Sequence, residues 1–298
     1  MEVFLQQVLN GITIGAVYSV IGVGFTLIFG IMRILNFAYG EFFMIATYIA
    51  FFAYKDFGIP LIFVLIIAMI LLFCFGAITE KLIILPIRKK AKDWSAGVIM
   101  ATLGLQVVLQ SLALILGGGT FRGIASYLMG SLMIGPLIIS YERLLILTIS
   151  IFMLIATLLL INHTKLGLMM QAVAQNKEAA IVSGINPNKI YTISFGLSGL
   201  LVAVPGVLLM PILYAYPTVG QLPIMKAFAV TLLGGMGNIE GAIIGGFVLG
   251  IAEIFASAYI STLMKDGIAF AIMILVLIFY PSGLGQFIKR YKFSRSKI

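Results

Sequence analysis

Residues 164–190, TKLGLMMQAVAQNKEAAIVSGINPNKI, are the longest polar interval between two strongly hydrophobic blocks of the chain. The spacing of the apolar residues in this interval predicts one or two short amphipathic helices lying at a membrane surface. Gly184 is expected to end the last of these helices, because glycine adopts the left-handed cap conformation without a Cβ clash. Asn186 and Pro187 are expected to begin the next helix, as N-cap and first-turn proline.

The composition on either side of this interval indicates a membrane protein. The chain is 62% hydrophobic and only 10% charged, and its mean hydropathy is +1.18, far from the values of soluble domains. Long apolar blocks in hydrocarbon must pair every backbone polar group internally, which favours helices. We therefore expect an all-α polytopic membrane protein, formed as a single transmembrane domain over residues 1–298.

Basic residues predict how the hydrophobic segments are oriented. Most of the nineteen Lys and Arg residues lie in the intervals 80–95, 164–190 and 285–298, which are therefore assigned to the cytoplasm. A nucleic-acid site in the basic tail is not expected, because no aromatic or loop-like pattern accompanies it. Eight hydrophobic segments are separated by these and other intervals, at roughly residues 8–30, 34–54, 59–79, 96–118, 143–163, 191–213, 224–262 and 267–284.

A glycine-rich break is predicted inside the segment 224–262. With 164–190 and the tail on the same side, an even number of crossings must lie between them, whereas three segments are present. The sequence GGMGN at 234–238 interrupts the long segment, and such breaks at membrane depth occur where the backbone is buried in protein or lines a cavity. The alternative is a flexible turn at the cytoplasmic surface. With the break, the chain is expected to cross about nine times, with its N-terminus outside and its C-terminus in the cytoplasm, whereas an unbroken count gives eight hydrophobic segments.

A weak internal repeat supports this break. The stretch TLIFGIMRI at 26–34 aligns with TLLGGMGNI at 231–239, and the alignment continues with Gly40 on Gly245. Substitution of Gly235 or Gly237 by leucine is expected to do more harm than substitution of Gly117 in the external glycine run, because a side chain restricts the backbone and prevents close packing.

Three stretches carry a family resemblance. The motif EAAIVSG at 178–184 resembles the cytoplasmic coupling loop of ABC importer permeases, where a short helix docks on the ATPase subunit. Together with NFAYGEF at 36–42 and LGGMGNIEGA at 233–242, it resembles the membrane subunits of high-affinity branched-chain amino-acid importers, in a larger family that also serves sugars and urea-like substrates. The resemblance covers nearly the whole chain. The family commonly has histidine where this chain has Tyr39, which keeps a hydrogen-bonding tip.

The resemblance implies a function and a set of partners. The chain would pass branched-chain amino acids across the inner membrane together with a second permease subunit, two cytoplasmic ATP-binding subunits and an external substrate-binding protein. Residues implied in ATPase coupling are Met170, Val173, Glu178, Ala179, Ala180 and Gly184, with the apolar face that includes Ala179 and Ala180 filling the partner's groove. Candidate residues of the translocation pathway are Asn36, Tyr39, Glu41, Gly235, Gly237 and Asn238.

Individual polar residues allow further expectations. Glu41 and Glu253 lie in or beside membrane segments, where carboxylates are rare and are functional candidates by default. Alternatively, Glu41 pairs with Arg33 or with the amides of a helix N-terminus. Asn36 is expected to be an N-cap. The glycine pairs of 241–250 have the small-xxx-small spacing that favours close helix contact.

Other classes of function remain as alternatives. We expect no metal site, cofactor or ATP hydrolysis by this chain, because it has one cysteine, one histidine and no complete phosphate-binding loop. An ion-driven secondary carrier would usually need several buried ionisable groups, and the sequence suggests few beyond Glu41 and Glu253. A scaffold subunit, or an ABC permease for urea, amides or sugars, are further alternatives.

Overall fold

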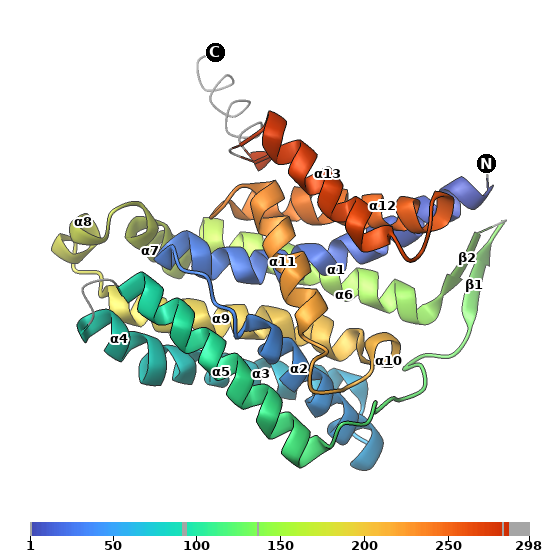
Figure 1. Ribbon diagram of the computed structural model, residues 1–298, viewed down its shortest axis with the longest axis horizontal. Helices are drawn as coiled ribbons and strands as arrows, with labels where there is room; N and C mark the ends of the chain where they lie inside the picture. The colour runs from blue at the N-terminus through green and yellow to red at the C-terminus, as the bar shows by residue number, and fades with distance from the viewer. Residues whose placement is uncertain (1, 91–93, 136, 282, 286–298) are drawn as a thin grey trace. The chain divides into compact units, whose positions relative to one another are not determined.

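The computed structural model describes residues 2–90, 94–135, 137–281 and 283–285 of the 298-residue chain. Most of the basic tail predicted at 285–298 lies outside these described residues. Helices make up most of the described chain, and the single sheet found there is a two-stranded hairpin (Figure 1). The elements are α1 (Glu2–Met32), α2 (Tyr39–Phe51), a π-helix (Phe52–Asp56), α3 (Leu61–Thr79), a π-helix (Glu80–Ile84), α4 (Leu85–Lys90), α5 (Trp94–Gly117), β1 (Ser131–Ile134), β2 (Leu137–Ser140), α6 (Tyr141–His163), α7 (Lys165–Gln175), α8 (Lys177–Val182), α9 (Pro187–Leu208), α10 (Met210–Leu213), α11 (Gln221–Gly234), α12 (Ile239–Tyr259) and α13 (Lys265–Phe279).

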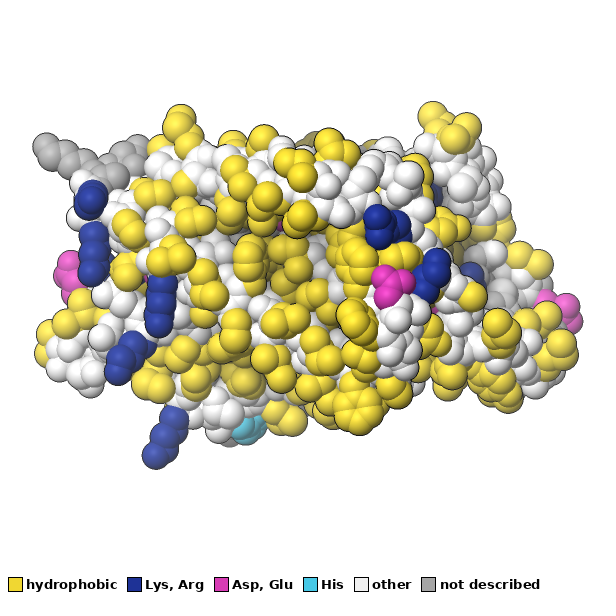
Figure 2. All heavy atoms as spheres, turned by 90° about the horizontal axis from the view of Figure 1, so that it is seen from below, with side chains coloured by type: hydrophobic (Ala, Val, Ile, Leu, Met, Phe, Trp, Pro, Cys, Tyr) yellow, Lys and Arg dark blue, Asp and Glu magenta, His cyan; other side chains and the backbone are white. Residues whose placement is uncertain are grey.

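Six helical runs of the described chain are long and apolar enough to cross a membrane. They are α1, the continuous run Leu61–Lys90, α5, α6, α9 and α12. Hydrophobic side chains cover much of the face shown in Figure 2, and many large apolar residues of α3, α5 and α6 are exposed. A soluble monomer rarely exposes so much contiguous apolar surface. The expectation of a helical, multi-pass membrane protein is therefore confirmed.

The chain forms two compact units, and α1, α6 and α11 contribute to both. Unit 1 is built from the described parts of 1–26, 128–155 and 226–298, and unit 2 from those of 27–127 and 156–225.

Unit 2 has its core where α9 packs against α2 and α3. Glycines at these crossings let the backbones approach closely: a Cβ at Gly199 would strike the Leu72 carbonyl, and one at Gly206 would strike the Ala46 side chain. Pro205 lies inside α9 and is buried. The crossing is therefore held by backbone contact that larger residues would prevent.

Unit 1 has its core where α12 packs against α1 and α11. A Cβ at Gly246 would strike Ser19 of α1, one at Gly250 would strike Gly15, and one at Gly245 would meet the Val230 carbonyl of α11. The small-xxx-small prediction for α12 is confirmed. At the crossing of α1 and α11, the hydroxyls of Thr26 and Thr231 are hydrogen-bonded at 2.8 Å, although these two threonines are 205 residues apart and equivalent in the proposed repeat.

The segment between α5 and α6 holds a hairpin that the sequence analysis did not predict. β1 and β2 pair antiparallel, with Ser131 opposite Ser140, and Gly135 in the turn has a φ of 59°. Both strands are apolar on both faces, so the alternation that signals a strand is missing. Gln6 of α1 fixes the hairpin through two hydrogen bonds to the backbone of Ile138, at 3.0 and 3.1 Å.

Candidate functional site

The interval 164–190 folds as two short helices, α7 and α8, each with a side-chain cap. The Thr164 hydroxyl accepts a hydrogen bond from the Gly167 amide at 3.1 Å. The Asn176 side chain accepts from the amides of Glu178 and Ala179, each at 3.0 Å. These bonds satisfy amides that the first turn of a helix leaves without partners. Of the one or two short amphipathic helices that the sequence predicts, the structure has two.

The exit from α8 has the geometry that the sequence predicts. Gly184 has a φ of 80°, and its amide donates to the Ile181 carbonyl at 2.9 Å. The Ile185 amide donates to the Ala180 carbonyl at 3.0 Å, which completes a Schellman motif. Asn186 then caps α9, with Pro187 in its first turn. A β-branched residue at position 184 would be strained at this φ.

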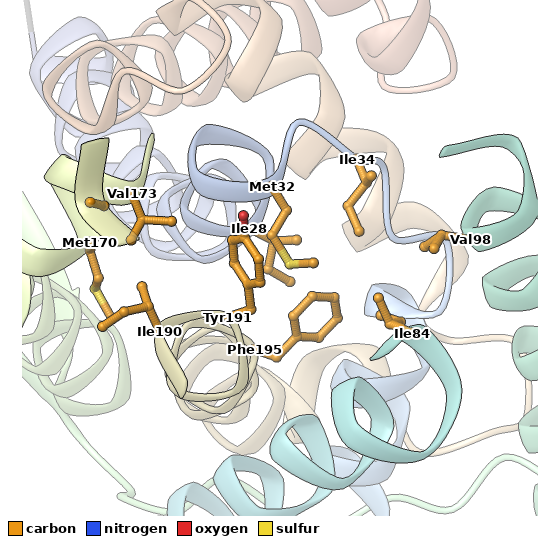
Figure 3. Close-up of a cluster of buried hydrophobic side chains, with 11 residues drawn as sticks. Ile28, Met32, Ile34, Ile84, Val98, Met170, Val173, Ile190, Tyr191 and Phe195 are labelled. Atoms are coloured by element: carbon orange, nitrogen blue, oxygen red, sulfur yellow. The ribbon is translucent and has the colours of Figure 1, made fainter. Parts of the chain in front are cut away.

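The interval 164–190 is anchored by apolar side chains that point into unit 2. Met170, Val173 and Ala180 are 2%, 3% and 3% exposed. They belong to a buried cluster with residues of α1, α5 and α9, among them Met32 and Tyr191 (Figure 3). The expectation that Ala180 lies on a surface that fills a partner's groove is wrong, because α8 turns this side chain inward against its own chain.

A different face of α8 is exposed. Glu178 and Ala179 are exposed, and Val182 is 90% exposed. Ile181 beside it is 50% exposed, so two neighbouring apolar side chains of this short helix are not covered by the chain itself. The surface formed by Glu178, Ala179 and Val182 is called the α8 face below.

A polar hollow of about 400 Å³ adjoins the α8 face. It is lined from the end of α1, from α4 and α5, and from the α7–α8 junction, including Arg33, Arg88, Trp94 and Lys177. Described parts of three links, 33–38, 80–95 and 164–190, therefore meet at one end of unit 2, where Figure 1 shows α4, α7 and α8.

Beside this hollow lies a buried ion pair that the sequence analysis missed. Glu80 is fully buried and accepts from Arg88 at 3.2 Å and from the Thr192 hydroxyl at 2.6 Å. Arg88 also donates to Asn188 at 2.8 Å and stacks on the Tyr191 ring, 4.2 Å from its centroid. The available signal was the spacing of Glu80 and Arg88, eight residues apart on one helical run.

The first helix break, between α1 and α2, is tightly organised. Arg33 has a φ of 55°. The Asn36 side chain accepts from the Ala38 amide at 3.1 Å, and the N-cap of α2 is Ala38. Asn36 therefore forms a turn ahead of the helix, and its assignment as N-cap is wrong. Tyr39 is fully buried and is hydrogen-bonded to Ser198 of α9.

Glu41 is 1% exposed and has one polar partner among the described residues. Its Oε1 accepts from the Gln110 side chain of α5 at 2.8 Å, while Oε2 is buried without a hydrogen bond to a described residue. Arg33 is exposed and forms no salt bridge with this carboxylate, so the alternative in which Glu41 pairs with Arg33 is wrong. A buried carboxylate with one free oxygen fits a functional role better than a structural one.

The second break is confirmed: α11 ends at Gly234 and α12 begins at Ile239. Gly235 and Gly237 have φ values of 92° and 81°, and Asn238 caps α12 by accepting from the Gly241 amide at 3.0 Å.

Other backbone packs onto this break. A Cβ at Gly241 would strike the Gly234 carbonyl, and one at Gly283 would strike Gly235. The Leu284 amide donates to the Leu233 carbonyl at 2.7 Å. Gly234 and Gly235 are buried, although Gly237 is exposed. The break is thus packed within unit 1 and is more than a flexible surface turn.

Unit 1 also contains an ion cluster inside the hydrophobic region. Lys226 of α11 is 4% exposed; its ammonium group lies 2.6 Å from Glu253 and 2.5 Å from Asp266. Glu253 also accepts from the Tyr18 hydroxyl at 2.9 Å, and Lys265 lies 3.7 Å from its other oxygen. The sequence analysis named Glu253 but missed Lys226, so its statement that few buried ionisable groups exist is wrong.

The six candidate pathway residues fall into two groups. Asn36, Tyr39 and Glu41 are brought together at the first break in unit 2, and Gly235, Gly237 and Asn238 at the second break in unit 1. Within each group, a helix stops, the chain turns and a new helix begins. Discontinuous helices of this kind commonly build solute sites in transporters.

Comparison with known proteins identifies the family. A family model described as "Branched-chain amino acid transport system / permease component" matches residues 7–277. The high-affinity branched-chain amino acid transport system permease proteins BraD of Pseudomonas aeruginosa and LivH of Escherichia coli K12 are each 32% identical over 295 residues, with 94% of this chain and 95% of each relative covered. The probable branched-chain amino acid transport permease protein LivH of Methanocaldococcus jannaschii is 30% identical over 283 residues, 89% of this chain and 87% of the relative. No solved structure matches significantly. The chain therefore belongs to the branched-chain amino acid permease family, and it is a membrane permease subunit of an ABC importer.

Proposed function

We propose that the chain carries branched-chain and similar aliphatic amino acids across the inner membrane, and that partner subunits hydrolyse the ATP. The names of the full-length relatives support the substrate class. The observation that carries the coupling role is the α8 face, which is exposed on a helix capped at both ends and anchored by Met170, Val173 and Ala180.

The α8 face is suited to transmit motion. Because Asn176 and Gly184 fix the two ends of α8, a force on Val182 reaches the buried cluster without first unwinding the helix. That cluster includes Met32 at the end of α1, next to the first break. A docked ATPase could therefore bias the position of the first break through packed side chains.

The importer is proposed to contain a second permease subunit, two cytoplasmic ATP-binding subunits and an external substrate-binding protein. We propose a single permease domain with nine crossings, an external N-terminus and a cytoplasmic C-terminus. This topology places three links in the cytoplasm, namely 33–38, 80–95 and 164–190. It is supported by the hollow at one end of unit 2, which described residues of all three links line. Six crossings correspond to the long apolar runs; α2 with its π-helix, α11 and α13 supply the others.

Uptake by the reconstituted complex tests this function. Proteoliposomes containing all subunits and the binding protein are loaded with ATP on the ATPase side, and uptake of labelled leucine is measured. Excess isoleucine or valine should compete, whereas urea and ribose should not. A complex with an inactive ATPase is the control. Uptake of urea or ribose without uptake of leucine would replace the substrate assignment. An ion-driven carrier is set aside by the family membership, and uptake should accordingly resist ionophores.

A further inference from the structure

Unit 2 contains a second hollow, about 520 Å³ in volume, between α2, α3 and α5. Apolar side chains line nearly all of it, including Ile45 and Ile49 of α2 and Ile67 of α3. Leu112 and Leu116 of α5 also line it, and they are 46% and 80% exposed. Because α5 is apolar enough to cross the membrane, the hollow continues into a face that contacts lipid hydrocarbon.

Two cationic side chains, Arg122 and Lys55, lie at the end of the hollow that is close to the C-terminus of α5. The Arg122 side chain donates to the Gly117 carbonyl at 2.7 Å, and its guanidinium lies 5.5 Å from the centroids of the Phe51 and Phe52 rings. The Lys55 ammonium lies 5.0 Å from the Phe51 ring. Gly117 and Phe52 both line the hollow, so the two cations stand beside its edge.

No salt bridge joins Arg122 or Lys55 to a carboxylate of the described residues, although the exposed Asp56 follows Lys55 in the chain. The Arg122 backbone is held in place by hydrogen bonds in both directions with Ala215, at 3.0 and 2.8 Å. The position of the Arg122 charge is therefore fixed by the fold, while the described residues of unit 2 supply no carboxylate to neutralise it. An anionic group would complete the arrangement.

Tyr48 adds a polar atom at the same end. Its ring lines the hollow, and its hydroxyl is buried without a hydrogen bond to any described residue. The ring lies against Gly117, where an added Cβ would meet the Tyr48 ring carbons and hydroxyl. A buried hydroxyl without a partner is uncommon and points to a bound group or water at this position.

We infer that this hollow binds an anionic phospholipid of the external leaflet, with an acyl chain between α2, α3 and α5 and the phosphate at Arg122 and Lys55. The helical part of this lining runs from Met44 of α2 to Ala53 of the following π-helix, about 13 Å of helix. That length is close to the roughly 15 Å of hydrocarbon in one leaflet. An apolar slot that ends beside two cations offers separate contacts to the acyl chain and to the phosphate of an anionic lipid.

Native mass spectrometry of the complete purified complex tests the site, after incubation with equal amounts of phosphatidylglycerol and phosphatidylcholine. Arg122→Gln and Lys55→Gln should each lower the ratio of bound phosphatidylglycerol to phosphatidylcholine about fivefold. Ala113→Trp, which fills the hollow, should lower retention of both lipids. Arg143→Gln removes a different exposed cation and Leu114→Trp enlarges a neighbouring residue outside the lining; both controls should behave as wild type.

Two results would overturn the inference. The first is an unchanged lipid ratio in the Arg122→Gln, Lys55→Gln double variant, which keeps the apolar lining and needs no repacking. The second is displacement of bound lipid by millimolar leucine, which would assign the hollow to the transported solute. If Ala113→Trp does not assemble, the charge variants alone decide the result.

Discussion

Replacing Lys226 with methionine is expected to destabilise unit 1 severely. Lys226 is 4% exposed and neutralises Glu253 at 2.6 Å. Without it, the buried carboxylate keeps only the Tyr18 hydroxyl at 2.9 Å and the Lys265 ammonium at 3.7 Å, itself 40% exposed. Removing one member of a buried ion pair typically costs about 3–5 kcal/mol.

Replacing Glu253, the partner of Lys226, should lower the stability of unit 1 by a smaller amount. Glu253→Leu leaves Lys226 bonded to Asp266 at 2.5 Å, and Asp266 is 39% exposed in its side chain, so water already solvates part of that pair. A loss of about 1–3 kcal/mol is expected. The double variant Lys226→Met, Glu253→Leu should recover much of the loss seen with Lys226→Met, because apolar groups of similar volume often replace a buried pair without cost.

Thermal unfolding of the purified complex, followed by intrinsic fluorescence, measures these differences. For chains of this size, 1 kcal/mol corresponds to roughly 2–4 °C, so Lys226→Met should lower the midpoint by roughly 10 °C. Lys265→Met removes the more distant cation and serves as the control, with a much smaller shift. A midpoint for Lys226→Met within about 2 °C of wild type, or a double variant no more stable than Lys226→Met, would refute the reasoning.

Three further predictions concern the second break and the coupling loop. Gly235→Leu should abolish uptake, because its φ is 92° and buried backbone packs against it. The expectation that Gly117 is a tolerant control is wrong, because Gly117 is buried at the end of α5 and a Cβ there would strike Tyr48. Gly119→Leu in the loop after α5 serves as the control and should retain most uptake; equal effects would mean that the break tolerates side chains. Ala180→Asp should lower the amount of folded subunit, because it buries an unpaired charge at a cost of about 3–5 kcal/mol. Ala179→Asp should leave the membrane level of the subunit unchanged and reduce ATPase co-purification. A normal membrane level for Ala180→Asp together with a lowered one for Ala179→Asp would contradict the inward orientation of the Ala180 side chain. A cysteine at Lys177 should react with an impermeant thiol reagent only after the membrane is opened, and labelling in intact cells would reverse the proposed orientation.

Local signals in the sequence predicted the local structure well. The caps at Asn186 and Gly184 and the break at 234–238 depend on residues within one helical turn of each other, so their geometry follows from conformational preference. The glycine spacing of α12 likewise predicted a close contact, although it could not name Ser19 and Gly15 as the partners.

Features that depend on residues distant in sequence were not predicted. Lys226 lies in an apolar stretch, and only the packing of α11 against α12 and α13 brings Glu253 and Asp266 to it. Glu41 pairs with Gln110, 69 residues away, instead of the nearer Arg33. Sequence periodicity gives the faces of a helix but does not say which apolar face its own chain will bury.

The position of Ala180 on α8 shows most clearly that the sequence does not say which face of a helix is buried. Ala179 and Ala180 are adjacent, and the motif alone assigned both to a docking surface. Ala180 is 3% exposed, because the Schellman turn and the cap at Asn176 rotate it toward Met170 and Val173. The face left for a partner is consequently more polar than the sequence suggested, with Val182 as its main apolar residue.

Cysteine crosslinking of the α8 face to the ATPase subunit tests the central claim most directly. In a background with Cys74→Ala, single cysteines are placed at Ala179, Val182 and the buried Ala180, and the assembled complex is treated with a short bifunctional thiol reagent. The cysteines at 179 and 182 should crosslink to the ATPase, with yields that change on ATP binding, and the cysteine at 180 should not. Absence of any crosslink from 179 and 182 in a complex that still transports leucine would contradict the account.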